Sequence, residues 1–205
     1  MFAKKVVPLQ PFMIERYEKS DLQEAVRTLR AGGIVLYPTD TVWGIGCDAT
    51  NEKAVHRIYE IKHRADSKSM LVLLDDIGKL QGYVDVPEVA EQLLEVSDGR
   101  RPMTIIYPNA RNLASNLIAE DGSIGIRITK EHFSKMLCEQ LHHPIVSTSA
   151  NISGETTPKT FSQISHAILD EVDYVCLYRR NDEEPKQPSS IIKVNIDNSF
   201  TIIRK

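Results

Sequence analysis

The sequence has few cysteines, no long hydrophobic run and no secretion signal. Its cysteines, Cys47, Cys138 and Cys176, lie far apart and form no CxxC pair, so we expect free thiols in a reducing compartment and no zinc site. The N-terminus has a basic pair but no apolar segment behind it, which argues against a signal peptide, and no apolar run approaches membrane-spanning length. We therefore expect a cytoplasmic protein without membrane contact.

A net positive charge and the common nucleotide motifs are lacking as well. The net charge is -3, so the chain as a whole is no basic nucleic-acid binder, and any such binding must come from a local patch. The sequence contains no GxxxxGK[ST], GxGxxG or GxSxG motif, which removes support for a P-loop, a dinucleotide-binding fold or a covalent serine mechanism.

What is present is an ordinary globular composition over 205 residues, with 41% hydrophobic and 26% charged residues. Strand and helix patterns alternate without a linker or repeat, so we expect one α/β domain over residues 1–205 with a mixed sheet. Helix starts are expected at two capping boxes, 20–23 and 160–163, and at the caps Asn51 and Thr129. Strands are expected over 174–178 and in a hairpin formed by 191–196 and 200–203.

The residues from Gly32 to Gly46 form the most informative stretch. Four apolar or aromatic residues bounded by glycines and proline predict a strand that is buried on both faces. Thr39, Asp40 and Thr41 follow at its end, where ligands bind in open α/β sheets, and Gly44 and Gly46 would let backbone approach such a ligand. A glycine turn without any ligand is the alternative.

Two further segments and one isolated residue carry polar groups that suit an anion. Lys62, Arg64 and Lys68 lie just past a predicted helix and can converge on a polyphosphate, although a solvated basic helix end, favoured by the helix dipole, is the simpler interpretation of these residues alone. Ser147–Gly154 places hydroxyls and an amide at the end of a buried strand, which suits anions and an amino-acid head group. Arg127 projects from an apolar strand and indicates either an anion or a surface salt bridge.

Together these segments resemble the YrdC/Sua5/YciO family. The likeness rests on Pro38-Thr39-Asp40-Thr41-Val42-Trp43-Gly44-Ile45-Gly46, on Lys62-His63-Arg64 and on Ser149-Ala150-Asn151, which match a PTDTVYGLG-like stretch, a KxR and an SxN. The resemblance implies an α/β fold in the single-domain form, with a twisted, mixed but largely parallel sheet, flanking helices and a large, positively lined concave cavity.

The resemblance also implies an activity. It is that of a nucleotidyltransferase, threonylcarbamoyl-AMP synthase, which joins L-threonine, bicarbonate and ATP, releases pyrophosphate and starts the formation of N6-threonylcarbamoyladenosine in tRNA. ATP is then a substrate, Mg²⁺ is expected with it, and no protein metal ligands are expected. Contact with tRNA or double-stranded RNA and with downstream tRNA-modification proteins would be compatible with this role.

The resemblance assigns site residues by their position in the motifs. Those implied on the threonine side are Thr39, Thr41, Arg127, Ser149 and Ser190. Those implied on the ATP side are Lys62, Arg64, Lys68, Asn151 and Arg204. Lys62, Arg64 and Ser149 are expected to be catalytic.

The chain also departs from the family pattern. Ala65 and Ser69 replace prolines beside the KxR, Arg100-Arg101-Pro102 replaces most of a PGPxT segment, and Trp43 replaces a common tyrosine. A non-catalytic, YciO-like protein that binds nucleotide or RNA through the basic surface of residues 53–68 is therefore the alternative. An enzyme that adenylates another small carboxylate is a third.

Overall fold

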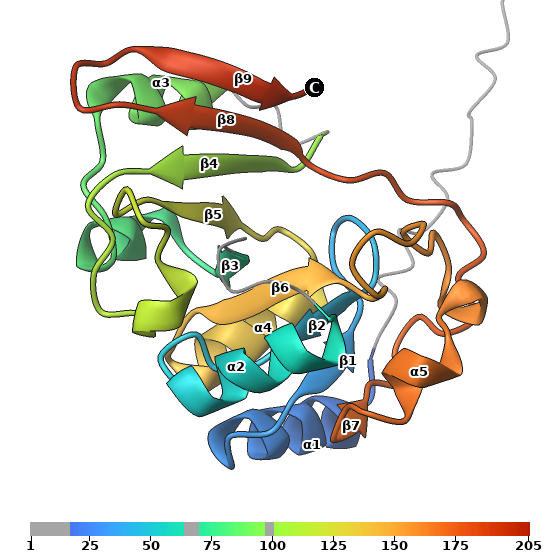
Figure 1. The fold of residues 1–205 in the computed structure, drawn as a ribbon. Coiled ribbons are helices and arrows are strands. Elements are labelled where there is room, and N and C mark those ends of the chain that lie inside the picture. The colour runs from blue at the N-terminus through green and yellow to red at the C-terminus, as the bar shows by residue number, and fades with distance from the viewer. Residues whose placement is uncertain (1–16, 64–69, 97–100) are drawn as a thin grey trace, which may run out of the picture.

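The computed structural model describes residues 17–63, 70–96 and 101–205 (Figure 1). The strands of these ranges form one nine-stranded sheet in the order β7-β1-β2-β6-β3-β5-β4-β8-β9. Their bounds are β1 Val35–Tyr37, β2 Gly44–Gly46, β3 Leu71–Leu74, β4 Met103–Tyr107, β5 Ile124–Ile128, β6 Ile145–Ser149, β7 Tyr174–Val175, β8 Ser190–Val194 and β9 Phe200–Arg204. The single domain expected over residues 1–205 stays a prediction, since residues 1–16 and two internal stretches lie outside the described ranges.

The sheet is mixed, as expected from the sequence. The parallel pairs among the described strands are β1–β7, β3–β5 and β4–β8, and the other five are antiparallel. Parallel pairing therefore does not predominate. The reason lies in connections such as those of β1 to β2 and of β8 to β9, which are too short for the crossover that parallel neighbours require.

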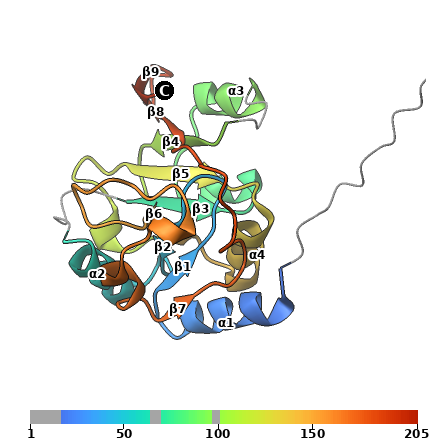
Figure 2. The same ribbon diagram turned by 90° about the vertical axis from the view of Figure 1, so that its right-hand side faces the viewer.

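Helices cover both faces of the sheet. On one face, α1 (Lys19–Arg30) packs beside α4 (His132–Leu141), and on the other lies α2 (Glu52–Ile61) (Figures 1 and 2). Side chains of β1 and of the preceding Ile34 alternate between the two cores: Val35 and Tyr37 join the α1–α4 cluster, whereas Ile34 and Leu36 join the larger one. The predicted strand buried on both faces is thus confirmed.

The remaining elements are short. They are α3 (Glu88–Val96), α5 (His166–Leu169) and the 3₁₀ segments η1 (Ile77–Gly82), η2 (Ser115–Leu117) and η3 (Phe161–Gln163). The hairpin of β8 and β9 forms as predicted, and Figure 2 shows α3 beside it. Among the described residues, no helix is long and apolar enough to cross a membrane.

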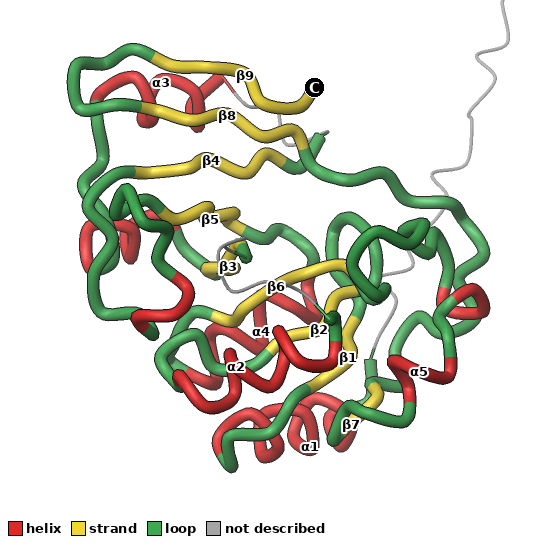
Figure 3. The backbone as a smooth tube through the Cα atoms, in the orientation of Figure 1, coloured by secondary structure: helices red, strands yellow, loops and turns green. Residues whose placement is uncertain are grey.

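The connection from β7 to β8 crosses most of the sheet. β7 is at one edge and β8 is next to the opposite edge, so residues 176–189 must pass over the strands between them. Figure 3 shows this long segment as a loop running up one side of the molecule. Its end places Ser189 against the sheet, where it becomes part of the cavity described below.

One of the four predicted helix caps is confirmed. Asn51 Oδ1 accepts a hydrogen bond of 3.1 Å from the Ala54 amide at the start of α2. The capping box at 160–163 is wrong, since Thr160 makes no capping bond to η3. The cap at Thr129 is wrong too, because Glu131 caps α4 through the amides of its first turn.

The capping box at 20–23 is wrong for a more informative reason. α1 begins at Lys19, and Asp21 is 2% exposed within it. The carboxylate accepts hydrogen bonds from the Tyr174 hydroxyl (2.7 Å) and from the amides of Leu177 and Tyr178 (2.9 Å each). These bonds withdraw both amides from the sheet, so the strand expected over 174–178 stops at Val175.

Candidate functional site

A cavity of about 330 Å³ opens along the middle strands of the sheet. This is at the lower end of the volumes, roughly 300–1,000 Å³, that hold small ligands. Its polar lining residues are Thr41, Thr104, Ser123, Arg127, Ser147, Thr148, Ser149, Thr157, Ser189, Lys193 and Arg204. No described lining residue is a carboxylate, so the cavity is rich in hydroxyls and positively charged.

Strand pairing brings two of the predicted segments together. β2 runs antiparallel to β6, with Gly44 opposite Ser149. The turn that precedes β2 and carries Thr41 therefore meets the hydroxyl-rich end of β6. Thr41 and Ser149, which are more than a hundred residues apart in sequence, line the same cavity as predicted.

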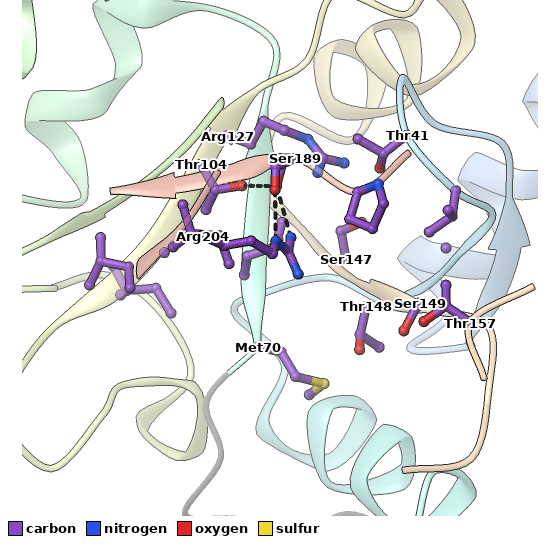
Figure 4. Close-up of a pocket in the computed structure, with 18 of the residues that line it drawn as sticks. Thr41, Met70, Thr104, Arg127, Ser147, Thr148, Ser149, Thr157, Ser189 and Arg204 are labelled. Carbon is purple, nitrogen blue, oxygen red and sulfur yellow. Dashed lines mark hydrogen bonds between the residues drawn. The ribbon is translucent and has the colours of Figure 1, made fainter. Parts of the chain in front are cut away.

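The cationic end of the cavity is formed by Arg127 of β5 and Arg204 of β9. Figure 4 shows their side chains on one side of the cavity, with Ser149 and Thr157 on the other. Burial lowers the pKa of Arg204, and the positive charge of Arg127 lowers it further. Arg204 forms no ion pair with a described carboxylate. Two partly desolvated guanidinium groups that repel each other form a site that an anion would stabilise.

Arg127 is 3% exposed and faces Asp40 across the cavity wall. Its Nη2 lies 3.1 Å from Asp40 Oδ1, close enough for an ion pair, yet Arg127 Nε and Asp40 Oδ1 have no hydrogen-bond partner. Burial raises the pKa of the Asp40 carboxyl, and Arg127 opposes that rise. The surface salt bridge considered from the sequence is thus a buried one, and the orphaned Nε leaves Arg127 with a donor to offer.

Ser189, and not the predicted Ser190, lines the cavity. Ser189 is 1% exposed, and its hydroxyl lies 2.8 Å from the Thr104 hydroxyl. Arg204 donates to the Ser189 carbonyl oxygen (2.9 Å) and to its hydroxyl (3.4 Å), as Figure 4 shows for the hydroxyl. Consecutive residues at the start of a strand point to opposite faces of the sheet, so the Ser189 side chain faces the cavity and that of the neighbouring Ser190 does not.

Thr39 lies behind Thr41 rather than in the cavity wall. Its hydroxyl is 2.8 Å from the Val42 carbonyl oxygen, which can only accept, and 2.9 Å from the Thr41 hydroxyl. Since the single proton of Thr39 goes to Val42, the proton between the two hydroxyls comes from Thr41. The Thr41 oxygen is then left with lone pairs, which suits an amine or hydroxyl donor on a ligand.

Lys62 does not line the cavity. It follows α2 directly and is 1% exposed, which makes the expectation of a surface position wrong. Its ammonium lies 2.5 Å from the carbonyl oxygens of both Ser149 and Asn151. The KxR and the SxN are therefore in direct contact, and the predicted role of Lys62 toward ATP stays a prediction.

Asn151 is 9% exposed, and its donors are engaged inside the turn. Its Nδ2 donates to the carbonyls of Ile152 (2.9 Å) and Glu155 (3.0 Å), and its backbone amide donates to the carbonyl of Ser149. Because both amide protons point at carbonyls, the remaining Oδ1 must be an acceptor, and it has no partner. An acceptor suits a cation or a donor group, so in this orientation the side chain does not support the predicted phosphate contact.

The basic surface predicted over residues 53–68 is smaller than the sequence suggested. Arg64 and Lys68 lie outside the described residues. Lys62 is buried, and Arg57 is paired with Asp173 at 2.9 Å. In the described part of this segment, Lys53 is the remaining exposed lysine or arginine, which weakens the argument for RNA binding through this face.

Gly46 has a structural role that the sequence did not reveal. A Cβ there would lie 2.3 Å from the Val146 carbonyl oxygen, so only glycine allows β2 and β6 to approach. Gly44 does line the cavity, as expected of a ligand approach. Trp43 also lines the cavity, and the centroids of the Trp43 and Phe161 rings are 4.9 Å apart.

Sequence reasoning missed four of the lining hydroxyls, those of Thr104, Ser123, Thr157 and Ser189. Thr104 ends the altered PGPxT segment and Ser189 is the neighbour of the predicted Ser190, whereas Ser123 and Thr157 lie outside every motif. The three cysteines are free thiols, as predicted, and all three are buried. In the described ranges, no group of three or more His, Cys, Asp or Glu side chains could hold a metal ion.

Known proteins match this chain over most of its length. The family model for the Sua5/YciO/YrdC domain, described as "Telomere recombination", matches residues 27–205. The chain is 31% identical over 159 residues to threonylcarbamoyl-AMP synthase of Pseudoalteromonas translucida (strain TAC 125), which covers 77% of this chain and 85% of that protein. It is 32% identical over 158 residues to the same-named protein of Vibrio vulnificus (strain YJ016), covering 76% and 85%.

Solved structures share the fold. E. coli YciO matches with a TM-score of 0.80 at 24% identity, covering 93% of this chain and 91% of that one. P. abyssi Sua5 complexed with L-threonine matches with a TM-score of 0.76 at 24% identity, covering 88% of this chain. This chain spans about half of that Sua5 protein, 52% of its length. At these identities, the likeness concerns the fold alone.

Proposed function

The chain belongs to the Sua5/YciO/YrdC family, and on that premise we propose that it is a threonylcarbamoyl-AMP synthase. The reaction would join L-threonine, bicarbonate and ATP to give threonylcarbamoyl-AMP and pyrophosphate. Two relatives with this name are 31% and 32% identical to the chain and are covered over 85% of their length. The observation that carries the proposal is the cavity itself, in which Arg127 and Arg204 lie at one end and Thr41 and Ser149 line the wall.

The chemistry requires two anions to be held together. The amine of threonine and bicarbonate form a carbamate and water. A carbamate oxygen then attacks the α-phosphorus of ATP, and the bond to pyrophosphate breaks. No covalent enzyme intermediate is needed, so orientation and charge stabilisation must supply the acceleration, and good orientation alone is worth up to about 7–11 kcal/mol.

We assign the threonine subsite to the cationic end. Arg127, with its unpartnered Nε, would hold the carboxylate, and the lone pairs of Thr41 would accept from the amine or hydroxyl. Ser189 takes the place predicted for Ser190, and Thr39 supports Thr41 from behind. Since Ser149 lies opposite Gly44 on the neighbouring strand, it would stand between this subsite and the nucleotide.

We assign the phosphates to Arg204 and to Arg64 and Lys68, of which the last two lie outside the described residues. Mg²⁺ would enter as part of the ATP complex and neutralise phosphate charge. No described residue of the cavity lining is a carboxylate for a resident ion. Asn151 is not among the lining residues, but its unpartnered Oδ1, buried just beyond Ser149, is a hard oxygen acceptor of the kind that fits such a cation. Asn151 would thus serve the nucleotide through its oxygen, not through its amide protons.

The biological setting follows from the reaction. The product carries an activated carbamoyl group, so it must be consumed by a transfer to an acceptor amine, and the adenosine of tRNA is the proposed acceptor. A cytoplasmic location and downstream tRNA-modification proteins belong to the same proposal. The non-catalytic RNA-binding alternative has less support, because the predicted basic face has lost Lys62 and Arg57 to buried or paired positions.

An ATP–pyrophosphate exchange assay tests the proposal. Exchange should require both L-threonine and bicarbonate, and it should fall at least tenfold in Arg204→Ala. Lys53→Ala, at an exposed lysine that is not part of the lining, should leave it unchanged. Absence of exchange at high enzyme concentration would refute the proposed activity, and exchange with another amino acid in place of threonine would reassign the substrate.

A further inference from the structure

Lys62 attaches the end of α2 to the turn after β6 at three points. Its ammonium donates to the carbonyls of Ser149 and Asn151, both at 2.5 Å, and its own carbonyl accepts a 2.8 Å bond from the Ser153 amide. The turn is also closed on itself, because the Asn151 amide donates to Ser149. Lys62 is thus hydrogen-bonded to both ends of the 149–153 turn.

The bond to Ser149 matters because of where that residue lies. Ser149 is the last residue of β6, where the ladder with β2 ends, and its side chain lines the cavity. Just past this point one backbone bond toward the β2 segment remains, from the Ala150 amide to the Trp43 carbonyl (3.1 Å), after which the chain turns away. The Lys62 ammonium, together with the Asn151 backbone amide, holds the carbonyl of Ser149, and with it the backbone position from which the Ser149 side chain reaches the cavity.

The burial of Lys62 argues that the charge is used inside the protein. The residue is 1% exposed, and its ammonium donates to two carbonyl oxygens. Burying an ammonium is costly unless its protons are satisfied, so removing either carbonyl would be unfavourable. The geometry therefore couples the position of Lys62 to that of the turn.

We propose that Lys62 is a positioning residue, which holds the Ser149–Ser153 turn so that Ser149 is presented to the threonine substrate. This inference rests on the proposed function and deepens it. If Lys62 bound the phosphates directly, its replacement would affect the binding of ATP alone. A positioning residue acts on the amino-acid subsite as well, even when no ATP is present.

The test compares binding of L-threonine, without ATP, in the wild type and in Lys62→Arg, measured by isothermal titration calorimetry. Arginine keeps the positive charge, but its planar guanidinium does not fit between carbonyls that a compact ammonium fills. We expect threonine to bind at least tenfold more weakly, since misplacement by about 1 Å can cost a hundredfold in rate. Lys53→Arg, at an exposed lysine of α2, the helix that Lys62 follows, is the matched control and should bind normally.

Thermal unfolding and a second variant complete the experiment. If Lys62→Arg does not fold, Lys62→Gln, which can donate to one of the two carbonyls, is measured in its place with the same expectation. Normal threonine binding in a folded Lys62 variant whose ATP affinity has fallen would overturn the proposal in favour of a direct phosphate contact. Failure of both variants to fold would overturn it in favour of a structural role. A wild type that does not bind threonine would instead contradict the proposed function itself.

Discussion

Replacement of Arg127 and Asp40, singly and together, separates the stability of the fold from the function of the cavity. The two side chains are 4% and 14% exposed and face each other at 3.1 Å. Removing one partner of a buried ion pair typically costs about 3–5 kcal/mol, whereas replacing both is often nearly neutral. We expect Arg127→Gln to cost about 3 kcal/mol, at the lower end, because Asp40 can take up a proton. The double variant should lie within about 1 kcal/mol of the wild type.

The cost of Arg127→Gln should depend on pH. Burial raises the pKa of Asp40 above its unfolded value, and loss of Arg127 removes the charge that opposes this rise. A carboxyl whose pKa is raised by folding favours the folded state most below its unfolded pKa, and that contribution is lost as pH rises through the folded pKa. Urea unfolding should therefore show Arg127→Gln to be less stable, relative to the wild type, at pH 8 than at pH 5.

Activity should not recover with stability in the double variant. A charge-assisted hydrogen bond to a carboxylate is worth about 1.5–3 kcal/mol, which corresponds to roughly a 10- to 100-fold rise in KM for threonine. Lys193→Gln, a cavity lysine paired with Asp121 at the surface, provides the control and should change KM much less. A double variant with the wild-type KM, or single variants that each cost under about 0.5 kcal/mol, would refute this reasoning.

Three further predictions concern stability. Asp21→Asn should lower the free energy of unfolding in urea by about 2–3 kcal/mol, because one of the three buried donors that Asp21 binds loses its acceptor. Ser20→Ala should lower it by under about 0.5 kcal/mol, and equal effects of the two variants would support the capping box instead. Gly46→Ala should lower the melting temperature strongly or prevent folding, whereas Gly82→Ala, where a Cβ meets nothing within 4 Å, should not. Unchanged melting curves for both variants would contradict the close packing of β2 against β6 at Gly46. The hydrogen bond from Lys193 lowers the pKa of Asp121 to about 2, so the stability that this carboxylate adds is present above its unfolded pKa near 4 and is lost as pH falls toward 2. Because the Asp121 side chain is 52% exposed, Asp121→Asn should lower the free energy of unfolding by under about 1 kcal/mol at pH 6, and this difference from the wild type should vanish by pH 2.

Local patterns predicted the elements whose causes are themselves local. The buried strand before Pro38 follows from consecutive apolar residues, and the cap at Asn51 from a side chain that reaches an amide three residues on. The hairpin of β8 and β9 follows from two apolar runs around a polar turn. Where a residue has a distant partner, the same rules failed: Asp21 looks like part of a cap, but it binds amides more than 150 residues away.

The sequence by itself determined the family, through three motifs in order, and with it the kinds of groups that a site would contain. Only the tertiary structure decided how these groups are used, because their roles depend on distances between segments far apart in the chain. It placed Lys62 inside the protein against the SxN turn, turned the donors of Asn151 inward and left Arg127 Nε unpaired. It also chose Ser189 over Ser190, since strand alternation admits only one of two neighbours to the cavity.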